Sequence, residues 1–323
     1  MGTRILGWGT ALPDKVVTNH DLEKTLNTSD EWIVDRSGIS ERRIGDSTAE
    51  LAIAAGRNAL TRADIDPASI DLMILATTTP DQTVPATSAH VHHELALGGG
   101  AFDLNAACSG FVYSLVMANG MLEAGANRIL VIGAETLSRI TDWSDRNTAV
   151  LFGDGAGAIV LESTPGDGQL LAWDLGLDGS ARDILKSEVG GTIEMDGREV
   201  FKRAVRAMVD SSMRTLECAK VRPEEIKLVV PHQANIRIIQ AACDRLGIDR
   251  ERAAIVLHKT GNTSSASIPL ALVDAIDKGR VEDGNLVLLT GFGAGMTWGS
   301  VLLRWQDPPE SDDSAGRGEN THG

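Results

Sequence analysis

The chain has 323 residues, of which 42% are hydrophobic, and a formal net charge of −15 at pH 7. This length allows one large domain or two ordinary ones, with enough apolar residues for a buried core. The negative charge argues against a nucleic-acid-binding surface, which needs surplus lysine and arginine. No apolar run approaches the ~18 residues of a membrane span, and the first residues lack a secretory leader pattern. Three scattered cysteines show neither disulfide-framework nor metal-site spacing, so we expect a reducing, cytoplasmic compartment.

Predicted strands and helices alternate through the first half of the chain. An apolar run at 4–9 predicts a strand, and a polar residue at 28–30 can cap a helix that carries Trp32 and Ile33. The apolar spacing predicts further helices at 48–62 and 86–97, buried strands at 70–77 and 128–134, and a glycine-rich turn into a strand from Gly153. This alternation is typical of an α/β fold.

Cys108 lies where a short extended run changes to helical spacing. The stripe Phe111, Leu115 and Leu122 predicts a helix over 109–122. A thiol at the first turn of a helix faces unpaired backbone N–H groups and the positive end of the helix dipole, which favour the thiolate. Cys108 is therefore a candidate nucleophile, although this stretch alone fits a small buried residue equally well.

The second half of the chain repeats the pattern of the first. A helix over 200–216 leads into KVRPEEIKLVVPH, which matches ADIDPASIDLMILA, and the interval 108–125 equals the interval 262–279. Two similar α/β halves would bring Cys108 and Asn262 to one cavity. We predict an N-terminal half at 1–163, a C-terminal half at 164–306, and a disordered acidic tail at 307–323.

Three polar stretches follow predicted strands in the second half and complete the candidate site. They are VVPHQAN with His232 and Asn235, HKTGNTSSAS with Asn262, and GFGAGMTWG with Gly293. Taken singly, a histidine at a strand end fits a satisfied core residue and GNTSSAS fits an ordinary helix cap.

Taken together with Cys108, these stretches resemble the thiolase superfamily, and specifically the β-ketoacyl-acyl carrier protein synthase III family that starts fatty-acid chains. The resemblance covers about residues 3–305 and rests on DEWIxxRxGIxER, AACSGF, GDGAGA, PHQAN, GNTSSASIP and GFGAGMTWG. It implies a thiolase-like α/β fold with two similar halves in five α-β-α-β-α layers. It also implies a catalytic triad of Cys108, His232 and Asn262, with an oxyanion-binding glycine at Gly293.

The resemblance further implies a decarboxylative condensation. The thiolate of Cys108 would attack an acyl-coenzyme A, while the backbone N–H groups of Cys108 and Gly293 hold the oxyanion. A malonyl group on acyl carrier protein would then lose CO₂, with the enolate oxygen held by His232 and Asn262. This route needs no metal or cofactor, and we expect a neutral imidazole at His232, which donates a proton to the hydrogen bond without quenching the enolate.

The same family assigns coenzyme A contacts to five positions. Trp32 and Arg146 would flank the adenine, although Trp32 alone would fit a buried anchor of its own helix. The other contacts would come from Thr28, Arg36 and Asn235.

The resemblance also implies two macromolecular contacts. An acidic carrier protein could dock on local positive charge, offered by Lys202, Arg203, Arg206, Arg214 and Arg237, although solvated helix faces look much the same. A homodimer is expected because the family builds its acyl pocket partly from the partner subunit. At the end of that pocket, Val84 stands where acetyl-preferring members often carry an aromatic side chain. The smaller residue leaves primer length and branching open.

Several rival functions share parts of this pattern. A starter-unit condensing or acyl-transfer enzyme of a polyketide or other secondary-metabolite pathway would keep Cys108 and His232. A hydroxymethylglutaryl-coenzyme A synthase is disfavoured because its general-acid glutamate is replaced by Thr78, and a Cys-His-Asn protease because the motif CG[SA]CW is missing. A partner subunit without activity would be expected to lack the nucleophile.

Other motifs look like a metal site or a nucleotide-binding loop, but the spacing of their residues argues against both kinds of site. In HVHHE, His90 and Glu94 share a helix face while His92 and His93 point elsewhere, so we expect a solvated helix and no metal site. GWGT lacks the third glycine of a dinucleotide fingerprint, and GDGAGA leads into a strand, so neither predicts nucleotide binding.

Overall fold

The computed structural model describes residues 2–45, 47–166 and 168–308, so most of the predicted tail lies outside the described residues. The strands are β1 (Gly2–Ala11), β2 (Lys15–Thr18), β3 (Glu41–Ile44), β4 (Leu72–Ala76), β5 (Gly100–Leu104), β6 (Arg128–Thr136), β7 (Asp154–Thr164), β8 (Leu170–Leu177), β9 (Leu185–Lys186), β10 (Glu194–Met195), β11 (Ile226–Pro231), β12 (Leu286–Gly293) and β13 (Thr297–Arg304). The helices are α1 (Asn19–Glu23), α2 (Asp30–Ser37), α3 (Thr48–Ala63), α4 (Thr87–Glu94), α5 (Gly110–Glu123), α6 (Arg146–Ala149), α7 (Gly197–Ala219), α8 (Ile236–Leu246), α9 (Leu257–Thr260) and α10 (Ser267–Asp277). The predicted α/β alternation is confirmed.

Two main sheets form the frame of the molecule. The first has the strand order β1-β7-β6-β4-β5, and the second has the order β11-β12-β13-β8. In the first sheet β4 runs parallel to β5 and β6, whereas β7 runs antiparallel to β1 and β6. In the second sheet β11 is parallel to β12, and β13 is antiparallel to both its neighbours.

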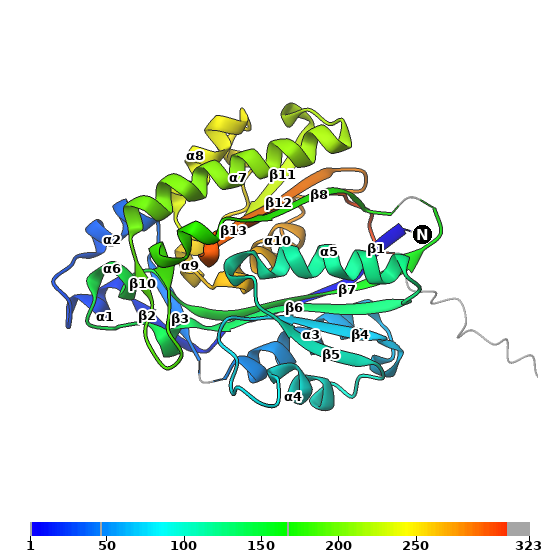
Figure 1. Cartoon of the computed structure of the whole chain (residues 1–323), viewed down its shortest axis with the longest axis horizontal. Helices are drawn as coiled ribbons and strands as arrows, with labels where there is room; N and C mark the ends of the chain where they lie inside the picture. The colour runs from blue at the N-terminus through cyan, green and yellow to red at the C-terminus, as the bar shows by residue number, and fades with distance from the viewer. Residues whose placement is uncertain (1, 46, 167, 309–323) are drawn as a thin grey trace, which may run out of the picture.

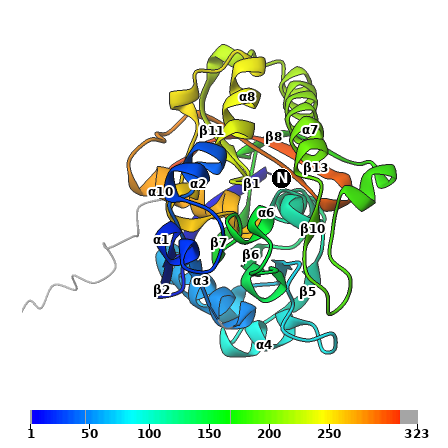
Figure 2. The ribbon, with the colours of Figure 1, turned by 90° about the vertical axis from the view of Figure 1, so that its left-hand side faces the viewer.

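Helices cover both sheets and fill the space between them. Helices α5 and α10 lie in the middle layer, α3 and α4 lie on the outer face of the first sheet, and α7 and α8 lie outside the second (Figures 1 and 2). Phe111 and Leu115 from α5 pack in one cluster with Ile268 and Leu272 from α10, and all four are buried. The five predicted layers are therefore present.

The two sheets repeat one arrangement. The order β1-β7-β6-β4 corresponds to β8-β13-β12-β11, and a 3₁₀ turn precedes both β4 and β11, at Pro67–Ser69 and Pro223–Glu225. This correspondence supports a division of the chain near residue 163, at the end of β7, which we retain as a proposal.

The glycines of GDGAGA were expected in a turn; Gly153 does precede the strand, but Gly155 and Gly157 lie inside β7. A Cβ on Gly157 would stand 2.7 Å from Cβ of Pro269 in α10. Glycine is needed here because the middle helix packs directly on the strand. In this way the motif fixes the position of α10 and of the polar turn that leads into it.

Among the described residues, no helix is both long enough and apolar enough to cross a membrane.

Candidate active site

Cys108 lies in the 3₁₀ turn Ala107–Ser109, directly before α5. Ala107 adopts a left-handed backbone conformation, with φ of 49°, which costs a residue with a Cβ about 1–2 kcal/mol. Two hydrogen bonds hold the turn: the Ala107 N–H donates to Oδ1 of Asn105 at 3.1 Å, and Oγ1 of Thr297 donates to the carbonyl of Ala106 at 2.9 Å. The candidate nucleophile Cys108 therefore lies on a strained turn that is held by hydrogen bonds from both parts of the chain.

The expected thiolate at Cys108 is not supported by its surroundings. Burial raises the pKa of the thiol to about 12, a hydrogen bond with the Ser264 side chain lowers it, and the charge of Glu135 raises it. Burial outweighs the helix terminus because an isolated anion loses its hydration there. The resting group at neutral pH is therefore a thiol.

Gly293, at the end of β12, lies against the backbone of Cys108. A Cβ added to Gly293 would stand 2.6 Å from the backbone nitrogen of Cys108, 2.8 Å from Oγ1 of Thr297 and 2.9 Å from Cβ of Ala107. Only a residue without a side chain allows this approach. The backbones of the two proposed oxyanion residues are therefore neighbours.

His232 follows β11 and is buried, with 1% of its surface exposed. Its backbone N–H donates to the carbonyl of Thr290 in β12 at 2.8 Å, and its ring meets Phe292 edge-on with centroids 5.3 Å apart. Burial lowers the pKa of the imidazole to about 3, so the ring is neutral at pH 7, as expected.

Asn262 is held by backbone pairing with the first half. Its N–H donates to the carbonyl of Leu151 at 2.8 Å, and its own carbonyl accepts from the Gly153 N–H at 3.0 Å. The side-chain Oδ1 accepts from the Ser264 N–H at 2.9 Å. Because Oδ1 is occupied in this way, the amide presents its NH₂ group on the other side as a donor.

Common neighbours bring the three predicted residues into one site. A Cβ on Gly291 would stand 3.5 Å from Cβ of His232 and 3.8 Å from the carbonyl oxygen of Cys108. Ser264, which binds the side chain of Asn262, also hydrogen-bonds the thiol of Cys108. The geometry thus joins a candidate nucleophile, a neutral imidazole and an amide donor.

Glu135 is a buried residue beside this site that the sequence reasoning missed. Its Oε2 accepts hydrogen bonds from the Thr78 N–H at 3.0 Å and Oγ1 of Thr79 at 2.7 Å, and its Oε1 lies 2.8 Å from Oγ of Ser265. Glu135 thereby ties the ends of β4 and β6 to the turn that follows Asn262. A charged residue at the end of an apolar strand was the signal in the sequence.

The residues assigned to coenzyme A gather at α2, α6 and the start of α8. Trp32 is half-buried, and its ring stacks with the guanidinium of Arg146 at 4.6 Å and that of Arg36 at 5.2 Å. Oγ1 of Thr28 is buried without a hydrogen-bond partner, and Nδ2 of Asn235 donates to the carbonyl of Arg36 at 2.9 Å. Since Arg146 rests on Trp32, an adenine can enter between them only if Arg146 moves.

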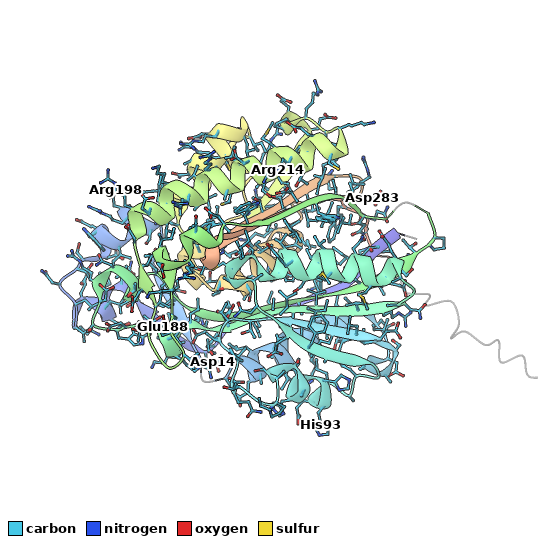
Figure 3. The ribbon with its side chains drawn as sticks, in the orientation of Figure 1. Asp14, His93, Glu188, Arg198, Arg214 and Asp283 are labelled. Atoms are coloured by element: carbon cyan, nitrogen blue, oxygen red, sulfur yellow. The ribbon has the colours of Figure 1, made fainter. Side chains whose placement is uncertain are left out.

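Ion pairs offset much of the predicted docking charge. Arg203 pairs with Asp178, Arg206 with Asp210, Arg214 with Asp174, and Arg237 with Asp35. Lys202 is exposed on α7, the same helix that carries Arg198 and Arg214 on the outer side of the molecule (Figure 3). These pairs reduce the positive potential that the sequence suggested.

Val84 and His93 of α4 are exposed on the surface of this chain. The side chain of Val84 is 83% exposed. Nε2 of His92 lies 2.7 Å from the carbonyl of Gly99, and His93 projects outward from α4 (Figure 3). In the described part of the chain, no three His, Cys, Asp or Glu side chains are grouped so as to hold a metal ion.

The raised pKa of Cys108 predicts a steep pH dependence of its alkylation. Because only the thiolate reacts, iodoacetamide labelling should accelerate about tenfold per pH unit from pH 7 to beyond pH 9. The rate is measured by mass spectrometry of the peptide that contains Cys108, with the exposed Cys218 as an accessibility control and Cys108→Ala as the blank. A plateau below pH 8 would show a thiolate at rest and contradict this description.

Comparison with known proteins shows the family to which this chain belongs. Two family models match, 3-oxoacyl-[acyl-carrier-protein] synthase III over residues 102–179 and its C-terminal counterpart over residues 216–305. The β-ketoacyl-[acyl-carrier-protein] synthase III of Aquifex aeolicus is 49% identical over 309 residues, which cover 94% of this chain and 100% of that protein. A synthase III of Bacillus anthracis is 47% identical over 311 residues, covering 94% and 99%.

Solved structures give the same result. The Aquifex aeolicus synthase superposes with a TM-score of 0.92 over 94% of this chain and all of the other. The priming β-ketosynthase of the R1128 polyketide pathway superposes with a TM-score of 0.91 at 36% identity, covering 95% and 97%. The fold is thus thiolase-like, and the chain belongs to the 3-oxoacyl-[acyl-carrier-protein] synthase III family.

Proposed function

We propose that this chain is an acyltransferase that condenses an acyl-coenzyme A primer with malonyl-acyl carrier protein and so begins fatty-acid chains. The observation that carries this proposal is the meeting of the partly buried Cys108 with a neutral His232 and Asn262 at one site. The polyketide alternative shares the fold, but the relative named for that pathway is 36% identical, against 49% for the Aquifex aeolicus synthase. The higher identity favours fatty-acid initiation.

In the first half-reaction, the sulfur of Cys108 attacks the thioester carbonyl of the primer. The backbone N–H groups of Cys108 and Gly293 stabilise the oxyanion as the carbon becomes tetrahedral. Collapse of the intermediate breaks the bond to coenzyme A, whose thiolate leaves and takes up a proton, and an acyl-enzyme remains. The raised pKa of Cys108 means that only a minor thiolate population starts this step.

In the second half-reaction, the malonyl thioester loses CO₂ and leaves an enolate. Its oxygen accepts hydrogen bonds from the imidazole of His232 and the amide NH₂ of Asn262. The enolate carbon attacks the acyl carbon on Cys108, the carbon–sulfur bond breaks, and the β-ketoacyl thioester departs. These side chains perform every step without a cofactor, and a neutral imidazole leaves the enolate unprotonated.

Coenzyme A would lie at the entrance formed by α2, α6 and α8. Trp32 and Arg146 would hold the adenine after Arg146 moves aside, with Arg36 and Asn235 beside them. The unpartnered hydroxyl of Thr28 supports a ligand contact at this entrance, because a buried hydroxyl normally has a hydrogen-bond partner. An acyl-coenzyme A and a carrier protein as substrates suggest the cytoplasm as the compartment.

The proposed assembly is a homodimer. Strand β5 forms an edge of the first sheet, and an unpaired edge is a ready site for pairing with another chain. Nearby α5 exposes 48% of Met117 and 44% of Met121, while β5 exposes 39% of Phe102. A second copy covering this surface would also bring its Val84 toward an acyl pocket, where the small side chain leaves space for a longer or branched primer.

The direct test is the intact mass of the protein after incubation with a panel of acyl-coenzyme A thioesters. An adduct should form on the wild type, be missing in Cys108→Ala, and be discharged by malonyl-acyl carrier protein as a β-ketoacyl product. The mass of the adduct identifies the primer. An adduct that malonyl carrier never discharges would favour the acyl-transfer alternative, and no adduct with any primer would refute the role of Cys108.

Gly293→Ala should slow acylation of Cys108 by roughly 100-fold or more, because the new methyl group displaces an oxyanion donor. Gly120→Ala is the matched control, since a Cβ there would have no atom within 4 Å. Rapid-quench mass spectrometry measures the rate of adduct formation. Equal rates for the two variants would remove Gly293 from the oxyanion site.

Replacing Lys202 and Arg237 with glutamate should raise the apparent KM for malonyl-acyl carrier protein by about tenfold, since each exposed charge contributes at most about 1 kcal/mol. Malonyl-coenzyme A should be affected much less, because it presents no acidic protein surface. Arg57→Glu, an exposed site on α3 at the opposite face, is the charge control. Equal changes with both malonyl donors would argue against carrier docking on this surface.

A further inference from the structure

The hydroxyl of Ser267 contacts the ring of His232 on the side away from Nε2. Oγ of Ser267 lies 2.6 Å from Nδ1 of His232, and this contact is buried, with 0% of Ser267 and 1% of His232 exposed. Ser267 is the first residue of α10, and its position is therefore fixed by the packing of that helix between the sheets. No bulk water competes for the contact.

The direction of this hydrogen bond follows from a count of donors. The backbone N–H of Gln233 donates to Oγ of Ser267 at 3.3 Å, so this oxygen already serves as an acceptor. Within the described residues, Nδ1 of His232 is the acceptor that lies within reach of the hydroxyl proton of Ser267. We infer that Ser267 is a positioning residue that donates to Nδ1 and so holds the proton of the neutral imidazole on Nε2.

The side chain of Gln233 holds its own backbone N–H in place against Ser267. Its Nε2 donates to the carbonyls of Pro231 at 2.7 Å and Ala254 at 3.0 Å, and its Oε1 accepts from the Val256 N–H at 3.0 Å. All three bonds are buried, which leaves the Gln233 backbone little freedom to rotate. The N–H of Gln233 therefore stays hydrogen-bonded to Oγ of Ser267. The hydroxyl proton of Ser267 in turn keeps pointing toward Nδ1 of His232.

This tautomer assigns His232 to one half-reaction, an inference that rests on the proposed function. With the proton on Nε2, the imidazole can donate to the oxygen of the malonyl thioester as CO₂ leaves. The same proton prevents Nε2 from accepting the proton of Cys108. Ser267 should therefore matter for decarboxylation and condensation, whereas formation of the acyl-enzyme should be independent of it.

The tautomer itself can be measured without any substrate. In protein labelled with ¹⁵N-histidine, the nitrogen shifts of His232 distinguish a protonated Nε2 from a protonated Nδ1, and the signal is assigned by its loss in His232→Ala. We expect a protonated Nε2 in the wild type and a mixture of tautomers in Ser267→Ala. A protonated Nδ1 in the wild type would overturn the inference, whatever reaction the protein catalyses.

The two half-reactions provide a second readout. Ser267→Ala should slow the discharge of the acyl-enzyme by malonyl-acyl carrier protein by about 10- to 100-fold, the loss typical when the hydrogen-bond partner that orients a metal-binding histidine is removed. Formation of the acyl adduct should stay near the wild-type rate, and Ser267→Thr, which keeps the hydroxyl, should restore discharge. The control Ser114→Ala removes a buried hydroxyl that has no partner. Equal losses in both half-reactions, or none in either, would contradict the assignment.

Discussion

The site depends on close backbone contacts between the two halves of the chain. Gly293 of β12 lies against the nitrogen of Cys108, and a Cβ at this position would stand only 2.6 Å from it. In the other direction, a Cβ on Gly133 of β6 would stand 2.4 Å from the carbonyl oxygen of Ser265. A strand glycine of each half thus packs against the turn of the other half that carries candidate site residues. The repeated fold explains this reciprocity, because β6 and β12 occupy equivalent places in the two sheets.

The same packing controls the ionisation of the reacting groups. Burial raises the pKa of Cys108 and lowers that of His232, so both are neutral at rest. A neutral imidazole suits hydrogen bonding to an enolate, whereas a neutral thiol makes acylation depend on a minor thiolate population. Glu135, buried among the hydroxyl groups of Thr77, Thr78 and Thr79, adds to the elevation of the thiol pKa. The protonation states of Cys108 and His232 are therefore set by the packing around them, to which distant segments of the chain contribute.

Much of the fold could be predicted from the sequence because hydrophobic spacing is local. The helix predicted at 48–62 forms at Thr48–Ala63, and the strand predicted at 128–134 forms at Arg128–Thr136. The resemblance to a known family supplied the candidate triad, and shared neighbours bring its three members to one site. The state of Cys108 could not be predicted, since it depends on burial by segments distant in the sequence. The ion partners of Arg214 and Arg237 likewise come from β8 and α2, and Gly155 and Gly157 of GDGAGA proved to be strand residues that accommodate α10.

We propose a division of labour in which Cys108 and Gly293 perform acyl transfer, while His232 and Asn262 perform decarboxylation. Its most direct test is a single-turnover measurement on His232→Ala, in which adduct formation from an acyl-coenzyme A and its discharge by malonyl-acyl carrier protein are timed separately. The account predicts an adduct that forms at close to the wild-type rate and then persists. Failure of His232→Ala to form the adduct would show that the imidazole acts in acylation and would contradict the account.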